Sequence, residues 1–250
     1  MTVTFLGRPL AQKRACFSRH FPLQSLYCKE LFKYHHGAST RAKNLTANQM
    51  IKQHSVLICL ALSVVLIVIA TLVYPGGSLL DKSSEGFDWS RNFFSNLFEE
   101  KAINGVENPS VVWALAGIMF YSFGYGIFFI NMSRKILVGQ AAVVLKLIGT
   151  ANILFTFLIA TALHDLMVTI SSTLFLLGMF YVTVFVARTK HRLLTLACVI
   201  SLLMFYYTLF LYGSGNWRWL AIMQKVSLIG SIPLVVGLEY LTNLEDFNPI

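Results

Sequence analysis

The sequence predicts an all-α integral membrane protein, a bundle of six transmembrane helices with an amphipathic helix in its first outer loop. Three observations lead to this fold class. Hydrophobic residues make up 56% of the chain and charged residues only 12%, against about 25% charged residues in an ordinary soluble domain. Apolar stretches of about 20 residues, the length that crosses a bilayer, recur through residues 54–242. One long polar interval, residues 75–109, separates the first stretch from the others.

The first 53 residues are predicted to form a basic, disordered segment in the cytosol. Residues 1–49 contain eight Lys or Arg and one Glu, so the rest of the chain holds only +2 of the formal charge of +9. This segment has neither a sustained apolar periodicity nor the apolar core of a secretory signal peptide. The positive charge therefore gives no reason to expect nucleic-acid binding, and Met50 is a natural start for the membrane domain.

The six predicted spans cover residues 54–74, 110–131, 138–162, 166–187, 193–213 and 221–242, and a short tail, 243–250, follows them. Pro75-Gly76-Gly77 ends the first span, because proline cannot continue a helix and glycine loosens it. Asn108-Pro109 precedes the second span. A soluble protein of this length could not bury so many consecutive apolar residues in one core.

The distribution of Lys and Arg predicts the orientation of the bundle. Basic residues flank the first span and fill two alternate connections, which share one side: Lys52, Arg134, Lys135, Arg188, Lys190 and Arg192. The positive-inside rule makes this the cytoplasmic side, and an even number of spans returns the C-terminal tail to it. We expect both termini to lie in the cytoplasm.

The outer loop contains apolar residues at a helical spacing over residues 87–100. One face is aromatic, and the other carries residues such as Asp88, Arg91 and Ser95. A helix of this kind lies flat in the headgroup region or closes the mouth of a bundle. We predict a lid over the spans, with a surface helix that only fills the rim as the alternative.

Polar groups in or beside the spans are the candidates for a binding site, because such groups are costly in lipid and usually face the bundle interior. These candidates are Arg91, Asn96, Asn108, Asn152, Lys146 and Glu239. Asn152 is expected to form an interhelical hydrogen bond. Lys146 and Glu239 can pair with each other, or both can extend to the interface.

Four residues at the outer mouth are the candidates for catalysis: His164, Asp165, Asp88 and Ser95. Histidine titrates near neutral pH and can bind metals or transfer protons. Neighbours in a helix point in different directions, so His164 and Asp165 do not by themselves form a dyad. The alternative is that His164 caps a helix end or bonds to the first loop. Lys225, at the outer start of the sixth span, is in a position to neutralise Asp165.

No metal or cofactor is predicted. The four cysteines, Cys16, Cys28, Cys59 and Cys198, show neither a CxxC nor a His-linked spacing. We expect them to be free thiols.

Several short motifs resemble a known family. Tyr74-Pro75-Gly76, Ser95-Asn96-Leu97, Asn108-Pro109, His164 and residues 171–180 are similar to motifs of a bacterial family of six-helix membrane proteins. That family is built on a domain of unknown function and is distantly similar to Frag/DRAM-type membrane proteins. The resemblance covers residues 54–242 and implies a protein of a bacterial inner membrane. It implies the architecture more than an activity, and Phe98 stands where the family usually has Gly.

The favoured function is that of a non-enzymatic multi-pass membrane protein that binds a lipid or a membrane partner between its helices. A small-solute transporter is the alternative, although the sequence contains no clear internal repeat and no matching pair of broken spans. A second alternative is a membrane-embedded hydrolase of the ceramidase type that uses His164, since residues 87–97 faintly resemble the first loop of those enzymes. The sequence lacks their HxxxH motif, and a zinc site usually needs three protein ligands.

Overall fold

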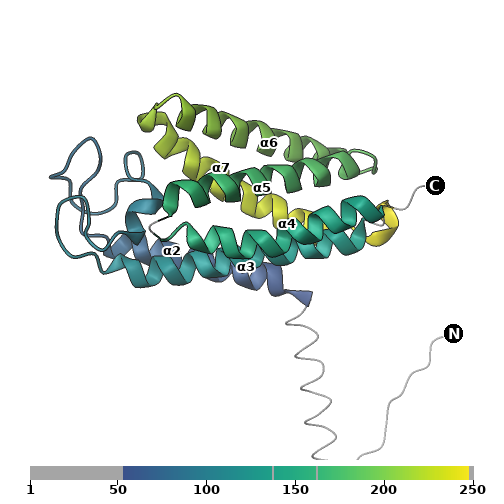
Figure 1. Ribbon diagram of the computed structural model, residues 1–250, viewed down its shortest axis with the longest axis horizontal. Helices are drawn as coiled ribbons and strands as arrows, with labels where there is room; N and C mark the ends of the chain where they lie inside the picture. Colours follow the sequence, from purple (N-terminus) through teal and green to yellow (C-terminus); the bar gives the residue numbers. More distant parts are fainter. Residues whose placement is uncertain (1–52, 137, 162, 248–250) are drawn as a thin grey trace, which may run out of the picture. The chain divides into compact units, whose positions relative to one another are not determined.

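The computed structural model describes residues 53–136, 138–161 and 163–247. The described residues form six helices that are long and apolar enough to cross a membrane (Figure 1). They are α2 (Ser55–Val73), α3 (Ser110–Lys135), α4 (Gly139–Leu158), α5 (His164–Val186), α6 (Arg192–Gly213) and α7 (Trp217–Leu241), with the short 3-10 helices η1 (Phe94–Phe98) and η2 (Leu244–Phe247). The predicted all-α bundle of six helices is confirmed. The predictions for residues 1–52 and 248–250 lie outside the described residues.

Most helix ends lie close to the predicted ones, and the differences have local causes. α3 continues to Lys135. Its last turn carries Arg134 and Lys135, whose positive charges stabilise the negative end of the helix dipole. α5 begins at His164 and not at residue 166, so His164 and Asp165 belong to its first turn, where the carboxylate of Asp165 interacts favourably with the positive end of the helix dipole. α7 begins at Trp217 because the side chain of Asn216 caps it, accepting a hydrogen bond from the backbone N–H of Trp219.

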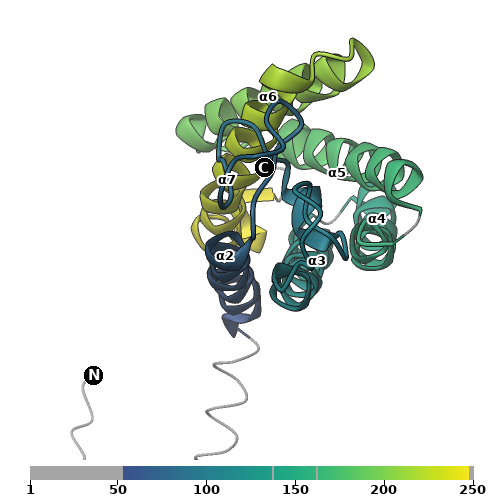
Figure 2. The ribbon, with the colours of Figure 1, turned by 90° about the vertical axis from the view of Figure 1, so that its left-hand side faces the viewer.

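Each helix packs against the next one along the chain, and α7 returns to contact α2 and α3 (Figure 2). The backbones of α3 and α4 approach each other closely. A Cβ atom on Gly149 would lie 2.7 Å from the carbonyl oxygen of Gly126, and one on Gly126 would lie 2.9 Å from the carbonyl oxygen of Gly149. Small residues of this kind allow membrane helices to bring their backbones together.

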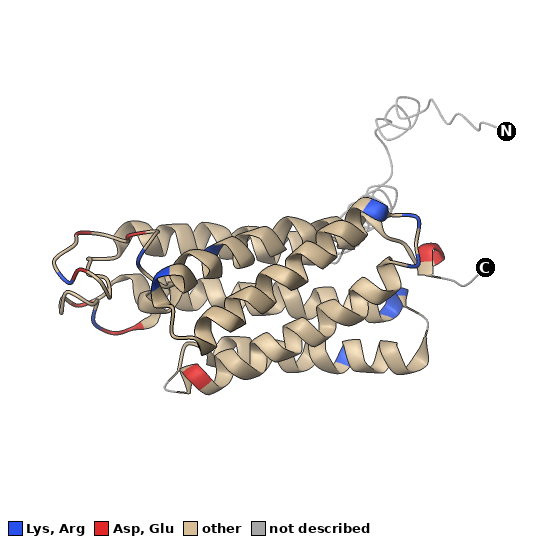
Figure 3. Ribbon diagram, turned by 90° about the horizontal axis from the view of Figure 1, so that it is seen from above, with Lys and Arg blue, Asp and Glu red and all other residues tan. Residues whose placement is uncertain are grey.

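The surface of the bundle suits a bilayer. Charged residues gather near its two ends and leave the middle almost free of them (Figure 3). Large apolar side chains cover the outside, such as Leu72 and Leu193, which are 78% and 80% exposed. Exposed apolar side chains of this kind are stable in contact with the hydrocarbon chains of lipids and unfavourable in water.

The two ends of the bundle differ. We call the end that carries residues 74–109 the loop end, and the other end the opposite end. His54 Nδ1 lies 2.8 Å from the hydroxyl oxygen of Tyr240 at the opposite end, so the start of α2 and the last turn of α7 share that side. The half of the bundle next to the opposite end is tightly packed, with side chains such as Phe128, Phe129 and Leu145 fully buried.

The loop contains no α-helix, so the prediction of an amphipathic helix over residues 87–100 is wrong in its extent. Only η1, Phe94–Phe98, is helical, and turns surround it. The cause is local competition for backbone hydrogen bonds. Asp88 Oδ1 accepts from the Ser90 N–H at 2.8 Å, and Asn96 Oδ1 accepts from the Phe93 N–H at 2.7 Å. These bonds favour turns over a continuous helical ladder.

The loop nevertheless packs firmly on the bundle. Leu97 is fully buried in a small cluster with Ala70 of α2 and Ala114 of α3. The hydroxyl oxygen of Tyr74 accepts a hydrogen bond from the backbone N–H of Ile103 at 3.2 Å. Gly77 has a φ of +85°, which other residues rarely adopt, and it has no room for a Cβ atom.

Candidate functional site

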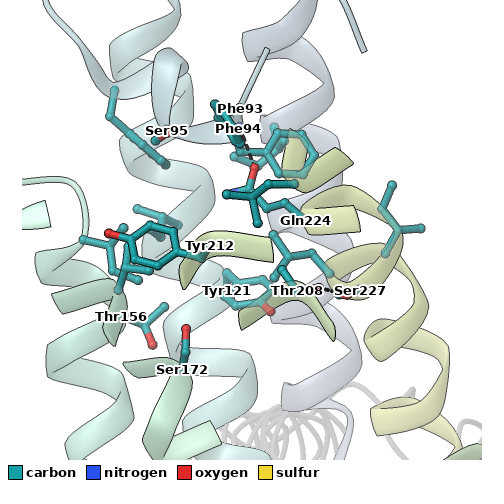
Figure 4. A pocket seen from close by; sticks show the side chains of 18 of the residues that line it. Phe93, Phe94, Ser95, Tyr121, Thr156, Ser172, Thr208, Tyr212, Gln224 and Ser227 are labelled. Atoms are coloured by element: carbon teal, nitrogen blue, oxygen red, sulfur yellow. Dashed lines mark hydrogen bonds between the residues drawn. The ribbon is translucent and has the colours of Figure 1, made fainter. Parts of the chain in front are cut away.

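A cavity of about 440 Å³ lies in the half of the bundle next to the loop end (Figure 4). All six helices and the loop contribute to its lining, which is mostly apolar. The volume is within the range of about 300–1,000 Å³ that small-molecule sites occupy. Below the cavity, toward the opposite end, lies the tightly packed half of the bundle.

Aromatic residues of the loop cover part of the cavity at the loop end. We call residues 87–98 the aromatic cap, of which Trp89, Phe93, Phe94 and Phe98 line the cavity. Within the cap, the ring of Phe87 stacks on that of Phe94 at 6.2 Å between centroids, and the edge of Trp89 meets both. The predicted lid therefore corresponds to a folded loop rather than to a helix.

Two neighbouring residues of α7 bind the aromatic cap. Gln224 Oε1 accepts a hydrogen bond from the Phe94 N–H at 3.1 Å. The ammonium group of Lys225 donates to the carbonyl oxygens of Asn92 and Ala221. The ammonium nitrogen also lies 5.7 Å from the ring centroids of both Phe87 and Phe94, a distance at which a cation is attracted to an aromatic face.

Lys225 is unusual because it is 5% exposed and no Asp or Glu among the described residues lies within ion-pair distance of it. A buried charge without a counter-ion is costly unless hydrogen bonds and dipoles compensate it. Here two carbonyl groups and two aromatic rings provide that compensation. The prediction that Lys225 neutralises Asp165 is wrong, because its ammonium group is directed to the cap.

Hydroxyl groups from the helices add polar points to the apolar lining. Thr208 and Ser227 bond to each other at 2.9 Å. The hydroxyl oxygen of Thr156 lies 2.6 Å from that of Ser171. By contrast, the hydroxyls of Ser63 and Ser172 also line the cavity but have no hydrogen-bond partner among the described residues.

A more polar vestibule of about 570 Å³ adjoins the cavity at the loop end. The two spaces share Ser95, Phe98, Ile159 and His164. Exposed charged residues of the loop form the rim of the vestibule: Glu99, Glu100 and Lys101.

The structure brings three of the four catalytic candidates to this region. His164, Asp165 and Ser95 line the cavity, whereas Asp88 does not. His164 Nδ1 lies 2.7 Å from the carbonyl oxygen of Ile159, so it bonds to the end of the preceding helix, as the alternative reading expected. The described residues contain no group of three His, Cys, Asp or Glu side chains placed to hold a metal ion.

Asp88 and Arg91 belong to the surface of the loop. Arg91 Nε lies 3.5 Å from Asp88 Oδ2, and Arg91 Nη1 lies 4.0 Å from Asp81 Oδ2. Hydrogen bonds from Ser90 hold the pKa of Asp88 below its usual value, and those from Ser83 do the same for Asp81, with Arg91 adding to both effects.

The asparagines of the binding set hold the fold together. Asn152 Oδ1 on α4 accepts from the Ser171 hydroxyl on α5 at 3.0 Å, which confirms the predicted interhelical bond. Asn96 bonds to the backbone of the cap, as given above. Asn108 Nδ2 donates to the Glu99 carbonyl oxygen at 2.8 Å, and Asn108 Oδ1 accepts from Ser110 at the start of α3.

The possible pair between Lys146 and Glu239 is wrong. Lys146 is exposed on the outside of α4. Glu239 Oε2 lies 3.8 Å from Lys135 Nζ, and Glu239 Oε1 accepts from Asn131 Nδ2 at 2.7 Å. The last turns of α3 pack beside α7, so the partners of Glu239 come from α3.

The sequence interpretation missed Gln224, Ser63 and Tyr121, which line the cavity from three helices. An amide in an otherwise apolar span was the available signal for Gln224. Cys59 and Cys198 are free thiols, as predicted, and Cys16 and Cys28 lie outside the described residues.

Searches against models of protein families, curated proteins and solved structures find no match to this chain, so only the geometry of the cavity indicates what the protein binds.

Proposed function

We propose that this protein binds a membrane lipid inside its helix bundle, beneath the aromatic cap. The observation that carries the proposal is the apolar cavity of about 440 Å³, lined by all six helices and the loop. A cavity at membrane depth with apolar walls favours an acyl chain or another hydrocarbon body over a water-soluble molecule.

Two further features support a binding protein over the other hypotheses. The tightly packed half of the bundle blocks the path from the cavity to the opposite end, which argues against a small-solute transporter. A hydrolase of the ceramidase type needs metal ligands beside His164, and the described residues supply no such group. The resemblance to Frag/DRAM-type membrane proteins and a place in a bacterial inner membrane, with both termini in the cytoplasm, remain part of this proposal.

The test is the lipid that the protein retains during purification in a mild detergent, identified and quantified by mass spectrometry. Ser172→Phe adds a ring to the lining of the cavity and should remove most of the retained lipid. Thr173→Phe is the matched control, because Thr173 is the next residue on α5 and is exposed on the outside. Equal lipid retention in both variants and in the original protein would contradict the proposal.

A further inference from the structure

The lining of the cavity also indicates which class of lipid fits. Its lining contains one carboxylate, Asp165, and one imidazole, His164, and both lie in the first turn of α5 at the loop end. No Lys or Arg of the described residues lines the cavity. Lys225, the nearest buried cation to the cap, is already bound to backbone carbonyl groups. A phosphate or carboxylate inside the cavity would therefore be buried without a counter-ion, which is costly.

The deep part of the cavity carries polar groups that are uncharged. Ser63, Tyr121, Ser172 and Ser227 lie 10, 11, 8 and 10 residues from the loop-end terminus of their helices. A rise of 1.5 Å per residue places all four about 12–17 Å below those termini, near the middle of a hydrocarbon layer roughly 30 Å thick.

Ser63 is the most informative of these residues. It is 2% exposed, it lines the cavity, and its hydroxyl has no partner among the described residues. A buried serine in a helix usually bonds to its own backbone, as Ser122 does with the carbonyl oxygen of Ile118 at 2.8 Å. The hydroxyl of Ser63 remains available for a ligand. The loop end of the cavity carries the aromatic rings of the cap, beside the opening to the vestibule.

Resting on the lipid-binding function above, we propose that the ligand is an uncharged lipid with a hydroxyl group, bound with that hydroxyl against Ser63 and its apolar end toward the aromatic cap. This places the polar group of the ligand near mid-membrane, opposite to its orientation in a bilayer. The hydroxyl both donates and accepts, so one such group can satisfy Ser63 without introducing charge.

The test uses three probes with the same 12-carbon chain and a terminal bromine: 12-bromododecan-1-ol, 12-bromododecanoate and 1-bromododecane. Bromine quenches tryptophan fluorescence at short range, so it reports the apolar end of a bound probe beside Trp89. Trp113, Trp217 and Trp219 are first replaced by phenylalanine, so that the fluorescence comes from Trp89 alone. Trp89 lines the cavity but is itself 47% exposed, so saturation of the quenching distinguishes bound probe from probe in the detergent. The alcohol should quench Trp89 saturably and bind at least tenfold more tightly than the carboxylate.

Two serine variants test the hydrogen bond. Ser63→Ala should weaken binding of the alcohol by about five- to tenfold, the effect of one hydrogen bond, and should leave the bromoalkane unaffected. Ser201→Ala is the control, since Ser201 is also buried but does not line the cavity. Binding of the carboxylate as tight as that of the alcohol, or no effect of Ser63→Ala, would overturn this inference while the lipid-binding function stands. No saturable quenching by any of the three probes would instead contradict the lipid-binding function itself.

Discussion

Lys225 shows how a single buried charge can hold a loop in place. Its ammonium group joins α7 to the Asn92 carbonyl oxygen. Lys225→Met keeps most of the apolar stem but removes the donors and the attraction to the rings. We expect the protein to lose about 1–3 kcal/mol of stability, because buried carbonyl groups lose their partner.

Thermal unfolding in detergent, followed by fluorescence, measures this loss. Lys146→Met is the matched control, because Lys146 is exposed on α4 and should tolerate the change. Equal shifts in the two variants would show that the cap does not depend on the ammonium group.

Asn152 makes a second prediction at the scale of one residue. Asn152→Leu removes the acceptor shared by Thr156 and Ser171 and should weaken the packing of α4 on α5 by about 1 kcal/mol. Thr150→Val is the control, because the Thr150 hydroxyl is exposed and bonds only to the carbonyl of its own helix. An unchanged midpoint of thermal unfolding for Asn152→Leu would argue against the bond.

Single residues also show what the sequence can and cannot predict. Asn152 was predictable because a lone amide in an apolar span has few ways to be satisfied. The partner of Glu239 was not, because the choice between Lys146 and Lys135 depends on how far α3 extends and on which face of α4 turns outward. The free hydroxyl of Ser63 was also out of reach, since a serine pattern does not reveal a cavity.

At the scale of elements, the contact between α3 and α4 depends on two glycines. Gly149→Ala would place a methyl group 2.7 Å from the carbonyl oxygen of Gly126, so the helices must separate. We expect a loss of about 1–3 kcal/mol, typical of overpacking. Gly139→Ala on the same helix meets nothing within 4 Å and should be neutral in the same thermal unfolding measurement. Similar stabilities for both variants would contradict the close contact.

The loop is the element for which sequence periodicity failed. Its aromatic residues recur at a helical spacing, but polar side chains bond to nearby backbone groups and fold it into turns. The prediction of a cap over the bundle was nevertheless useful, because the same aromatic residues face the bundle in either conformation.

The carboxylates of the loop predict its response to acid. The pKa of Asp88 lies below its ordinary value of 3.8 in the folded loop, chiefly through hydrogen bonds from Ser90. A lowered folded pKa stabilises the folded state above the unfolded pKa, and this stabilisation is lost as the pH falls through the folded pKa. The fluorescence of Trp89 in the single-tryptophan protein should therefore stay constant from pH 8 to about pH 4 and change only below that. Ser90→Ala should move the change to higher pH, and a transition near neutral pH in the original loop would contradict this assignment.

At the scale of the whole molecule, an even number of candidate spans predicts that residues 53 and 247 lie on the same side of the membrane. The predicted side is the cytoplasm, from the positive-inside rule. In a background with all four cysteines replaced, a cysteine at Ser83 should react with a membrane-impermeant maleimide added outside intact cells, and one at Asn243 should react only after the cells are opened. The reverse pattern would invert the orientation, and labelling of both from outside would contradict an even number of spans.

The attachment of the cap to α7 has a consequence for biosynthesis. Asn92 and Lys225 are 133 residues apart, and the helix that carries the lysine is the last of the six to leave the ribosome. Until α7 has been synthesised, the aromatic loop can pack on α2 and α3 but lacks its bonds to α7. Completion of the site is thus delayed until the chain is almost fully translated, and in a chain truncated before α7 the loop would be held only by α2 and α3 and would be more accessible to proteases.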